Sequence, residues 1–218
     1  MGVCYIVGAG EFTRRGFAPG PEDFVLAADG GYVALKAIGV KPDLLLGDFD
    51  SLPAVPADVP VERHPTHKDD TDTGLALRRG WDMGFRAFAL YGCGGGRADH
   101  LLANFQNMCR LSRMGARICL IARDYDAWAI TNGALTLPPC PAGTGVSVFC
   151  HGERAEGVTL EGLVYPLANA TLTGDMPLGV SNQIADGNQS AVARVKSGTL
   201  LVFLLRGETA CNRAADAL

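Results

Sequence analysis

Two aspartates in the first half of the chain have a spacing that suits metal binding. The segment Gly-Asp-Phe-Asp-Ser at residues 47–51 places Asp48 and Asp50 two residues apart. In extended chain, residues two apart point to the same side, so both carboxylates would face one way and Phe49 the other. Two such carboxylates repel each other unless a cation or a proton lies between them. Mg²⁺ commonly binds one or two carboxylates together with substrate phosphates, so the segment fits a magnesium site, with a turn carrying two solvated aspartates as the alternative.

A second acidic segment, Lys-Asp-Asp-Thr-Asp at residues 68–72, opens a predicted helix. Asp70 or Thr71 can cap that helix, and acidic residues in a first turn complement the helix dipole. Capping alone does not account for Lys68 together with three carboxylates within five residues. Asp72 can supply a further metal ligand, and Lys68 can pair with a phosphate group.

A glycine-rich segment, Gly-Cys-Gly-Gly-Gly-Arg-Ala-Asp-His at residues 92–100, has the character of a phosphate site. Glycines let the backbone approach a phosphate, and the helix that follows directs N–H groups toward it. Arg97 adds a donor that suits two phosphate oxygens at once. The segment is not a P-loop, because no Gly-Lys-Ser/Thr follows it. We interpret His100 as a helix-terminal residue, and we expect Asn104 on the exposed side of its helix as a solvated polar residue.

The elements that position these motifs form an α/β pattern in residues 1–122. Continuous apolar runs predict strands buried on both faces, at Cys4–Val7, Phe24–Ala28, Leu44–Leu46, Ala87–Tyr91 and Ile118–Ala122. Helices are predicted between them, each closed by a glycine, at Tyr32–Ile38, Thr73–Met83 and His100–Met114, before Gly39, Gly84 and Gly115. This alternation predicts an α/β layered domain with a mostly parallel sheet. In such sheets ligands bind beyond the carboxyl ends of the strands, where the three motifs above and Asp29-Gly30-Gly31 all fall.

From about residue 124 the helical pattern ends, and short β-prone runs separated by turn residues follow. The predicted strands are Ala127–Ile130, Val146–Phe149, Val158–Leu160, Ala170–Thr173, Val192–Val195 and Thr199–Leu205. The turn Lys196-Ser197-Gly198 predicts a hairpin between the last two. The pattern favours a smaller all-β sandwich. We therefore predict two domains, an α/β domain at residues 1–122 that carries the metal and phosphate motifs and a β-sandwich domain at residues 123–218.

Composition narrows the class of protein. The net charge of −4 offers no basic surface for a nucleic acid or another polyanion. The seven cysteines form no CxxC pair, which is typical of reduced thiols in a cytosolic protein. Residues 1–12 lack the pattern of a signal peptide, and the longest apolar run, Leu200 to Leu205, is far too short to span a bilayer. We expect a cytoplasmic protein.

The motifs, taken in order, resemble the thiamine pyrophosphokinase family. Asp-Gly-Gly, Gly-Asp-Phe-Asp-Ser, Lys-Asp-x-Thr-Asp and Gly-x-x-Gly-Gly-Arg-x-Asp-His occur in that order, followed by family-like segments at residues 162–167 and 179–182. The resemblance spans residues 29–182. It implies a homodimer whose subunits have an N-terminal α/β domain and a C-terminal β-sandwich. It also implies a Mg²⁺-dependent reaction in which the hydroxyl of thiamine attacks the β-phosphorus of ATP and AMP leaves.

The resemblance implies roles for individual residues. The side chains that it assigns to Mg²⁺ are Asp48, Asp50 and Asp72. The groups that it assigns to phosphate oxygens are Lys68, Arg97 and the backbone N–H groups near Gly95 and Gly96. Those expected to line the same pocket or to contact nucleotide are Asp29, Gly30, Asp69, Thr71 and Asp99. Of all these, the residues counted as catalytic are Asp48, Asp50, Asp72, Arg97 and Asp99.

Thiamine is expected to bind to the β-rich half, across the dimer interface. By resemblance the contacting residues are Tyr165, Ser181 and Asn182. Tyr165 stands where the family would be expected to have a stacking tryptophan, and an aromatic ring can still stack on a cationic ligand.

Two functions of other classes remain open from the sequence. A Mg²⁺-dependent phosphohydrolase would use the same carboxylates with water as the acceptor, and it would form AMP without thiamine. A non-catalytic nucleotide-sensing module would use the β-rich half as an interaction surface, and it would bind ATP without turnover.

Overall fold

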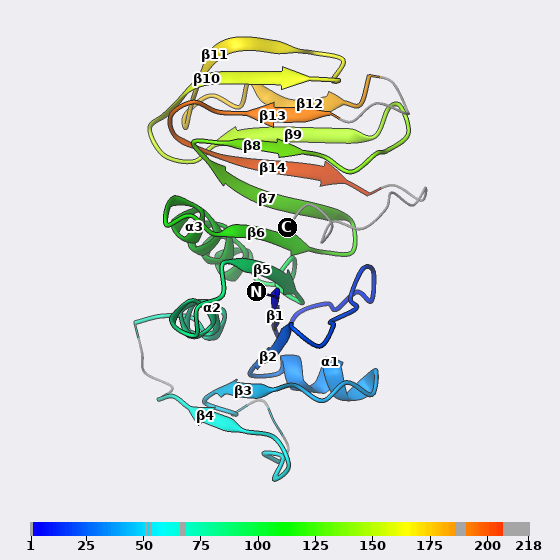
Figure 1. Ribbon diagram of the computed structural model, residues 1–218, viewed down its shortest axis with the longest axis vertical. Helices are drawn as coiled ribbons and strands as arrows, with labels where there is room; N and C mark the ends of the chain where they lie inside the picture. Colours follow the sequence, from blue (N-terminus) through cyan, green and yellow to red (C-terminus); the bar gives the residue numbers. More distant parts are fainter. Residues whose placement is uncertain (1, 51, 53, 66–68, 186–190, 207–218) are drawn as a thin grey trace. The chain divides into compact units, whose positions relative to one another are not determined.

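The computed structural model describes residues 2–50, 52, 54–65, 69–185 and 191–206 (Figure 1). The chain divides into two compact units. The first contains residues 1–107 and 120–123, and the second contains residues 108–119 and 124–218. The division falls within helix α3 (Ala98–Arg113) and within strand β6 (Arg117–Ile121). The predicted boundary between residues 122 and 123 stays a prediction.

The first unit is built on a parallel sheet. Its strands lie in the order β5-β1-β2-β3-β4, and their bounds are Ala87–Tyr91, Cys4–Val7, Phe24–Ala28, Leu44–Gly47 and Val61–Arg63. Every pairing among these five strands is parallel, with Ile6 at the centre opposite Leu26 and Leu90. All residues of β1, β3 and β5 are buried, as expected for strands covered on both faces. The predicted parallel sheet is confirmed.

The helices start and stop close to the predicted positions. Helix α1 spans Gly31–Ala37, α2 spans Asp72–Asp82 and α3 spans Ala98–Arg113. Gly39, Gly84 and Gly115 follow their C-termini with positive φ angles of 73°, 96° and 96°, the left-handed conformation that suits a terminating glycine. Within the described ranges, no helix is long and apolar enough to cross a membrane.

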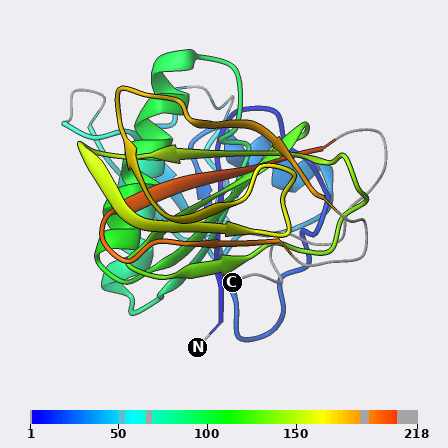
Figure 2. The ribbon, with the colours of Figure 1, turned by 90° about the horizontal axis from the view of Figure 1, so that it is seen from above.

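The second unit is an antiparallel β structure with two sheets, which confirms the predicted all-β region (Figures 1 and 2). One group of strands has the order β12-β9-β14-β7, with bounds Gly179–Gln183, Gly145–Cys150, Thr199–Leu205 and Tyr125–Thr131. The smaller sheet has the order β11-β10-β13-β8, with bounds Leu167–Thr173, Arg154–Glu161, Val192–Arg194 and Ala134–Thr136.

The predicted hairpin at residues 196–198 is wrong, because β13 and β14 belong to different sheets. The turn itself exists: Gly198 has a φ of 110°, and its N–H donates to Asn132 Oδ1 at 2.9 Å. The chain uses it to cross from one sheet to the other. Six of the seven residues of β14 are at least half-buried, five of them fully, so both faces need cover. A central position between β7 and β9 buries both faces of β14, whereas a hairpin with the short β13 would leave part of β14 exposed.

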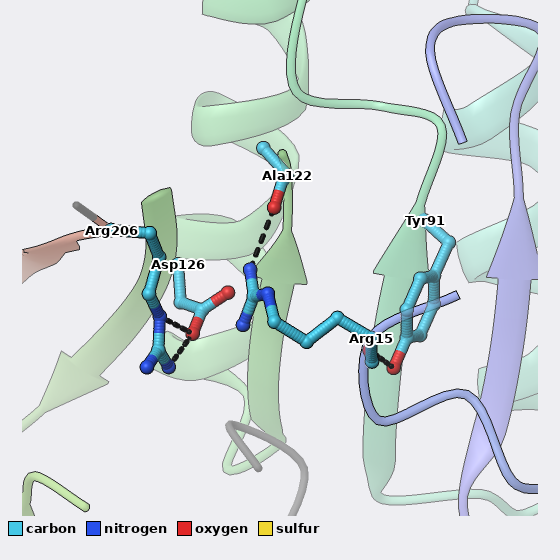
Figure 3. A network of polar contacts seen from close by, with 5 residues as sticks. All are labelled: Arg15, Tyr91, Ala122, Asp126 and Arg206. Atoms are coloured by element: carbon cyan, nitrogen blue, oxygen red, sulfur yellow. Dashed lines mark hydrogen bonds and ion pairs between the residues drawn. The ribbon is translucent and has the colours of Figure 1, made fainter. Parts of the chain in front are cut away.

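A buried ion pair holds the end of β14 in the second unit (Figure 3). Arg206 Nε donates to Asp126 Oδ2 at 2.8 Å, and the two side chains are 5% and 0% exposed. The backbone N–H of Arg206 also donates to Asp124 O at 2.7 Å. In the first unit, Arg15 Nη2 donates to Ala122 O at 2.7 Å, and the Tyr91 hydroxyl donates to Arg15 O at 3.3 Å.

The cysteines differ from the expectation in one respect. Among the described residues, Cys4, Cys93, Cys109, Cys119 and Cys150 are not disulfide-bonded. Cys140 is disulfide-bonded, so the prediction that all seven cysteines are reduced is wrong for this residue. A disulfide depends on the distance between two Cα atoms in the fold, which the spacing of cysteines along the chain does not reveal.

Candidate active site

Three carboxylates meet at the carboxyl edge of the parallel sheet. Asp29, Asp48 and Asp50 each offer one oxygen, and these oxygens lie within 4.8 Å of one another. Asp29 follows β2, and Asp48 and Asp50 follow β3. Because β2 and β3 are neighbouring parallel strands, both segments leave the sheet at the same edge, where Asp29 N donates to Leu46 O at 2.8 Å. Within the described part of the chain, the group thus contains Asp29, where the sequence led us to expect Asp72.

The chain between the two paired aspartates is a tight turn and not the expected extended strand. Phe49 has a φ of 66°, in the left-handed region that larger residues rarely adopt, and its side chain is buried. The N–H of Asp50 donates to Asp48 Oδ1 at 3.3 Å across the turn. Arg63 lies over the Phe49 ring, 4.9 Å from its centroid, and donates to Asp48 O at 3.1 Å. The turn lets the ring point inward while both carboxylates stay on the accessible side.

The carboxylates repel one another. The charge of Asp48 raises the pKa of Asp50 above its ordinary value, with smaller contributions from desolvation, from Asp29 and from Asp72. Asp72 is the first residue of α2, so it acts on the group electrostatically although its oxygens lie outside it. A cluster of hard oxygen donors under mutual repulsion gains from a divalent cation, and the donor set therefore fits Mg²⁺.

The segment before α2 is a capped helix start that also borders an open groove. The Thr71 hydroxyl accepts from Gly74 N at 3.0 Å, and Asp70 pairs with Arg78 at 2.8 Å, so the capping interpretation holds for this segment. Lys68 lies outside the described residues. The groove has a volume of about 420 Å³ and is lined by Asp69, Asp70, Thr71, Ala103, Gln106 and Asn107. The lining includes Gln106 and Asn107 of α3, and no motif in the sequence identifies these two amides as candidate site residues.

The glycine-rich loop after β5 leaves open space for a ligand. Gly95 and Gly96 are exposed, and a Cβ added to either would meet no atom within 4 Å. Arg97 forms two hydrogen bonds with Asp99, from Nε to Oδ1 at 3.1 Å and from Nη2 to Oδ2 at 2.6 Å. These bonds lower the pKa of Asp99 to about 2, so its carboxylate is ionised at neutral pH. Arg97 would therefore share its guanidinium between Asp99 and any phosphate that binds here.

Glycines allow the strand ends of this edge to pack against one another. Gly30 is the N-cap residue of α1, and a Cβ on the following Gly31 would collide with Val7 O at the end of β1. A Cβ on Gly47 would lie 3.1 Å from Asp29 Cβ, and one on Gly8 would lie 2.9 Å from Gly92 O. The ends of β3, β2, β1 and β5 therefore form one continuous edge that carries both the carboxylates and the glycine-rich loop.

Asn104 is a residue whose place we predicted wrongly. It is 5% exposed rather than solvated, and its Nδ2 donates to Cys93 O at 2.9 Å. It lies four residues before Met108 and seven before Leu111, both of which are buried in α3. The helical period therefore placed it on the apolar face, and that signal in the sequence identifies it as an internal polar residue.

In the second unit, the residues expected at thiamine lie on and beside strand β12. Asn182 is buried and its amide bonds both ways with the Tyr165 backbone, accepting from N at 3.0 Å and donating to O at 2.7 Å. The Tyr165 side chain is 67% exposed. Ser181 is exposed with a φ of 61°, and its N–H donates to Ser147 Oγ at 3.2 Å. Asn182 therefore holds the Tyr165 backbone, and Tyr165 and Ser181 present accessible side chains. A pocket of about 220 Å³ adjoins them, lined by Leu160, Tyr165, Leu167, Leu178, Gly179, Val180 and Asn182.

Comparison with known proteins gives a consistent family. Residues 21–120 match the catalytic domain of thiamin pyrophosphokinase, and residues 134–200 match the vitamin B1 binding domain of thiamin pyrophosphokinase. The chain belongs to the thiamine pyrophosphokinase family. A thiamine pyrophosphokinase of Bacillus subtilis is 29% identical over 168 residues, which cover 73% of this chain and 77% of the relative.

Solved structures of the thiamine pyrophosphokinase family share the fold. The crystal structure of thiamine pyrophosphokinase from Bacillus subtilis has a TM-score of 0.83 and 25% identity, covering 95% of this chain and 100% of that chain. The enzyme from Geobacillus thermodenitrificans has a TM-score of 0.82 and 26% identity, covering 95% and 99%. In this thiamine pyrophosphokinase family member, the described carboxylates and the glycine-rich loop fall within the catalytic match, and Tyr165, Ser181 and Asn182 fall within the B1-binding match.

Proposed function

We propose that the chain transfers a diphosphate group from ATP to the hydroxyl of thiamine, with Mg²⁺, leaving AMP. The observation that supports this most is the group of Asp29, Asp48 and Asp50 on the same sheet edge as the glycine-rich loop. A site for polyphosphate and a divalent cation needs both parts together.

Asp29, Asp48 and Asp50 would hold Mg²⁺, with Asp72 adding to the negative potential. The ion, when bound, would neutralise phosphate charge and withdraw electrons from the group being transferred. Gly95 and Gly96 are exposed and precede the start of α3, and the backbone N–H groups of such a loop suit phosphate oxygens.

The transfer itself needs positioning more than it needs a strong base. The hydroxyl oxygen of thiamine forms a bond to the β-phosphorus, and the bond from that phosphorus to the oxygen bridging to the α-phosphate breaks. AMP leaves with that oxygen, and the hydroxyl proton passes to solvent. Asp99, whose pKa the hydrogen bonds with Arg97 lower to about 2, would orient the Arg97 guanidinium.

The acceptor would bind to the second unit. Tyr165 presents an exposed ring beside the pocket of about 220 Å³, and such a ring can stack on the cationic thiazolium of thiamine. We infer that the protein is a homodimer in the cytoplasm and that a partner subunit completes the thiamine site. Exposed Leu178 and Val180 beside Tyr165 support a surface that another subunit covers.

Incubation of the protein with ATP, Mg²⁺ and thiamine tests the proposal. The expected products are AMP and thiamine diphosphate in a one-to-one ratio. ADP with thiamine monophosphate would refute diphosphate transfer. AMP formed equally well without thiamine would identify a phosphohydrolase, and ATP binding without any turnover would identify a nucleotide-sensing module. Sedimentation equilibrium tests the dimer, and a monomer at assay concentration would exclude a shared thiamine site.

A further inference from the structure

The glycine-rich loop is held from two sides by residues that the proposed function has not used. We call residues 92–96 the β5–α3 loop. From the side of β1, Gly10 N donates to Gly92 O at 2.8 Å. From the side of α3, Asn104 Nδ2 donates to Cys93 O at 2.9 Å. Two successive carbonyls at the start of the loop are thus fixed by donors from different elements.

These contacts lie at the point where the order in which the chain adds strands to the parallel sheet reverses. Strand β1 has β2 on one side and β5 on the other, and the chain leaves β1 toward β2 and later returns to β5. In open parallel sheets, ligands bind in the crevice outside the carboxyl ends of the two strands at such a point. Here those ends are the Gly8-Ala9-Gly10 turn and the β5–α3 loop.

The turn after β1 has no room for side chains where it faces the loop. A Cβ on Gly8 would lie 2.9 Å from Gly92 O, and one on Gly10 would lie 2.7 Å from the same atom. Neither glycine has a positive φ, so the requirement comes from close approach and not from backbone conformation. The N–H of Gly8 is engaged with Tyr91 O at 2.8 Å, which extends the contact along the end of β5.

A buried amide in α3 costs free energy unless it is hydrogen-bonded. Leucine at position 104 would continue the apolar face of the helix, so core packing alone does not require asparagine there. The bond from Asn104 to Cys93 O is directed at the loop that carries Gly95 and Gly96. A glycine-rich loop has many accessible conformations, and anchoring its first carbonyls limits them before a ligand arrives.

We propose that Asn104 and Gly10 are positioning residues: they fix the carbonyls of Cys93 and Gly92 so that the exposed part of the β5–α3 loop is preorganised for the diphosphate group being transferred. The kinetic part of this inference rests on the proposed function. The anion-binding part does not, because a preorganised loop binds a polyphosphate whether or not transfer follows.

The experiment uses the full chain and four variants. Asn104→Leu removes the donor to Cys93 O, and Gly10→Ala places a Cβ against Gly92 O. Ser112→Ala is the control for the first. Ser112 is a buried residue of the same helix, and the substitution removes the hydrogen bond of 3.0 Å between the Ser112 and Thr131 hydroxyls, which makes no contact with the carbonyls of Gly92 and Cys93. Gly20→Ala is the control for the second, since its Cβ would have only an ordinary contact of 3.7 Å with Asp23.

Three readouts separate positioning from general structural damage. They are kcat and KM for ATP and for thiamine, the Kd of inorganic triphosphate with Mg²⁺ by calorimetry, and the thermal midpoint. We expect kcat to fall about 10- to 100-fold in both test variants, the range for a displaced reacting group, and the Kd of triphosphate to rise at least about fivefold. The KM for thiamine should match that of the controls. The thermal midpoint should show that each variant is folded at the assay temperature, and that of Gly10→Ala should lie below its control because its Cβ would meet Gly92 O at 2.7 Å.

Each outcome decides one part of the inference. If both test variants keep kcat and triphosphate affinity within about twofold of their controls, the positioning role is refuted. If Asn104→Leu does not fold, Gly10→Ala decides alone, because it leaves α3 unchanged. If the wild-type chain binds triphosphate and the variants lose that binding, but no thiamine diphosphate forms, the proposed function fails while the anchoring of an anion-binding loop stands.

Discussion

Replacing Asp50 by asparagine should change the stability of the protein in opposite directions with and without Mg²⁺. The charge of Asp48 is the main reason that the pKa of Asp50 is raised in the folded protein. An acid whose pKa is raised by folding contributes stability below its unfolded pKa and loses that contribution as pH rises through the folded pKa. At pH 7 in a chelator, Asp50→Asn should therefore be slightly more stable than wild type, and this difference should vanish in acid and shrink in salt, because Asp50 is exposed.

With Mg²⁺ the order should reverse, because the variant replaces one of three clustered carboxylates with a neutral amide, whose oxygen binds a cation more weakly. A ligand at 100 times its Kd stabilises a protein by about 2.7 kcal/mol, and a tenfold weaker Kd at the same concentration reduces this to about 1.4 kcal/mol. For a chain of this size about 2–4 °C corresponds to each kcal/mol. Mg²⁺ should thus raise the melting midpoint by about 5–11 °C in wild type and by about 3–6 °C in the variant. Turnover should fall on the order of 10²–10³-fold, with partial recovery at raised Mg²⁺.

The assay is thermal melting across a Mg²⁺ titration and in chelator, together with initial rates of AMP formation. Asp58→Asn is the matched control, because Asp58 is an exposed carboxylate paired with Lys41 at 3.3 Å and lies outside the cluster. Asp48→Asn should behave like Asp50→Asn. An Asp50 variant with the same Mg²⁺-induced rise as wild type and normal turnover would show that the cluster is a group of solvated aspartates and not a metal site.

Three further predictions concern the second unit. Arg206→Met leaves the charge of Asp126 buried without the Arg206 cation, so the free energy of unfolding measured in urea should fall by about 3–5 kcal/mol. A fall below about 1 kcal/mol would contradict the stabilising role of this buried ion pair. Burial, and then the charge of Arg113, lower the pKa of His151. The stability that the neutral His151 contributes is therefore present above its ordinary pKa and is lost as pH falls through the lowered value. His151→Gln should reduce the loss of stability on the acid side of pH 6.5, which thermal melting as a function of pH would measure. Tyr165→Ala should raise the KM for thiamine and leave the KM for ATP unchanged, since the ring is 67% exposed; an unchanged KM for thiamine would remove Tyr165 from the site.

Much of the first unit could be predicted from local sequence. The strands Cys4–Val7, Phe24–Ala28 and Ala87–Tyr91 have the predicted bounds, because short apolar runs between polar motifs have few other ways to be buried. The helix ends follow from glycines that adopt positive φ without a steric penalty. The approach of Asp48 to Asp50 also follows from their spacing, although a turn at Phe49 and not an extended strand brings them together.

The sequence by itself determined which chemical groups the site contains and which strand each one follows. Only the tertiary structure decided which of them meet. Asp29 joins Asp48 because β2 and β3 are neighbours in a parallel sheet, and Asn104 reaches Cys93 O because α3 packs its apolar face inward. The crossing of β14 to a different sheet from β13 was likewise decided by the need to bury both faces of one strand. Turn and helix signals act over a few residues, whereas strand pairing and burial depend on partners far away along the chain, and no local pattern specifies them.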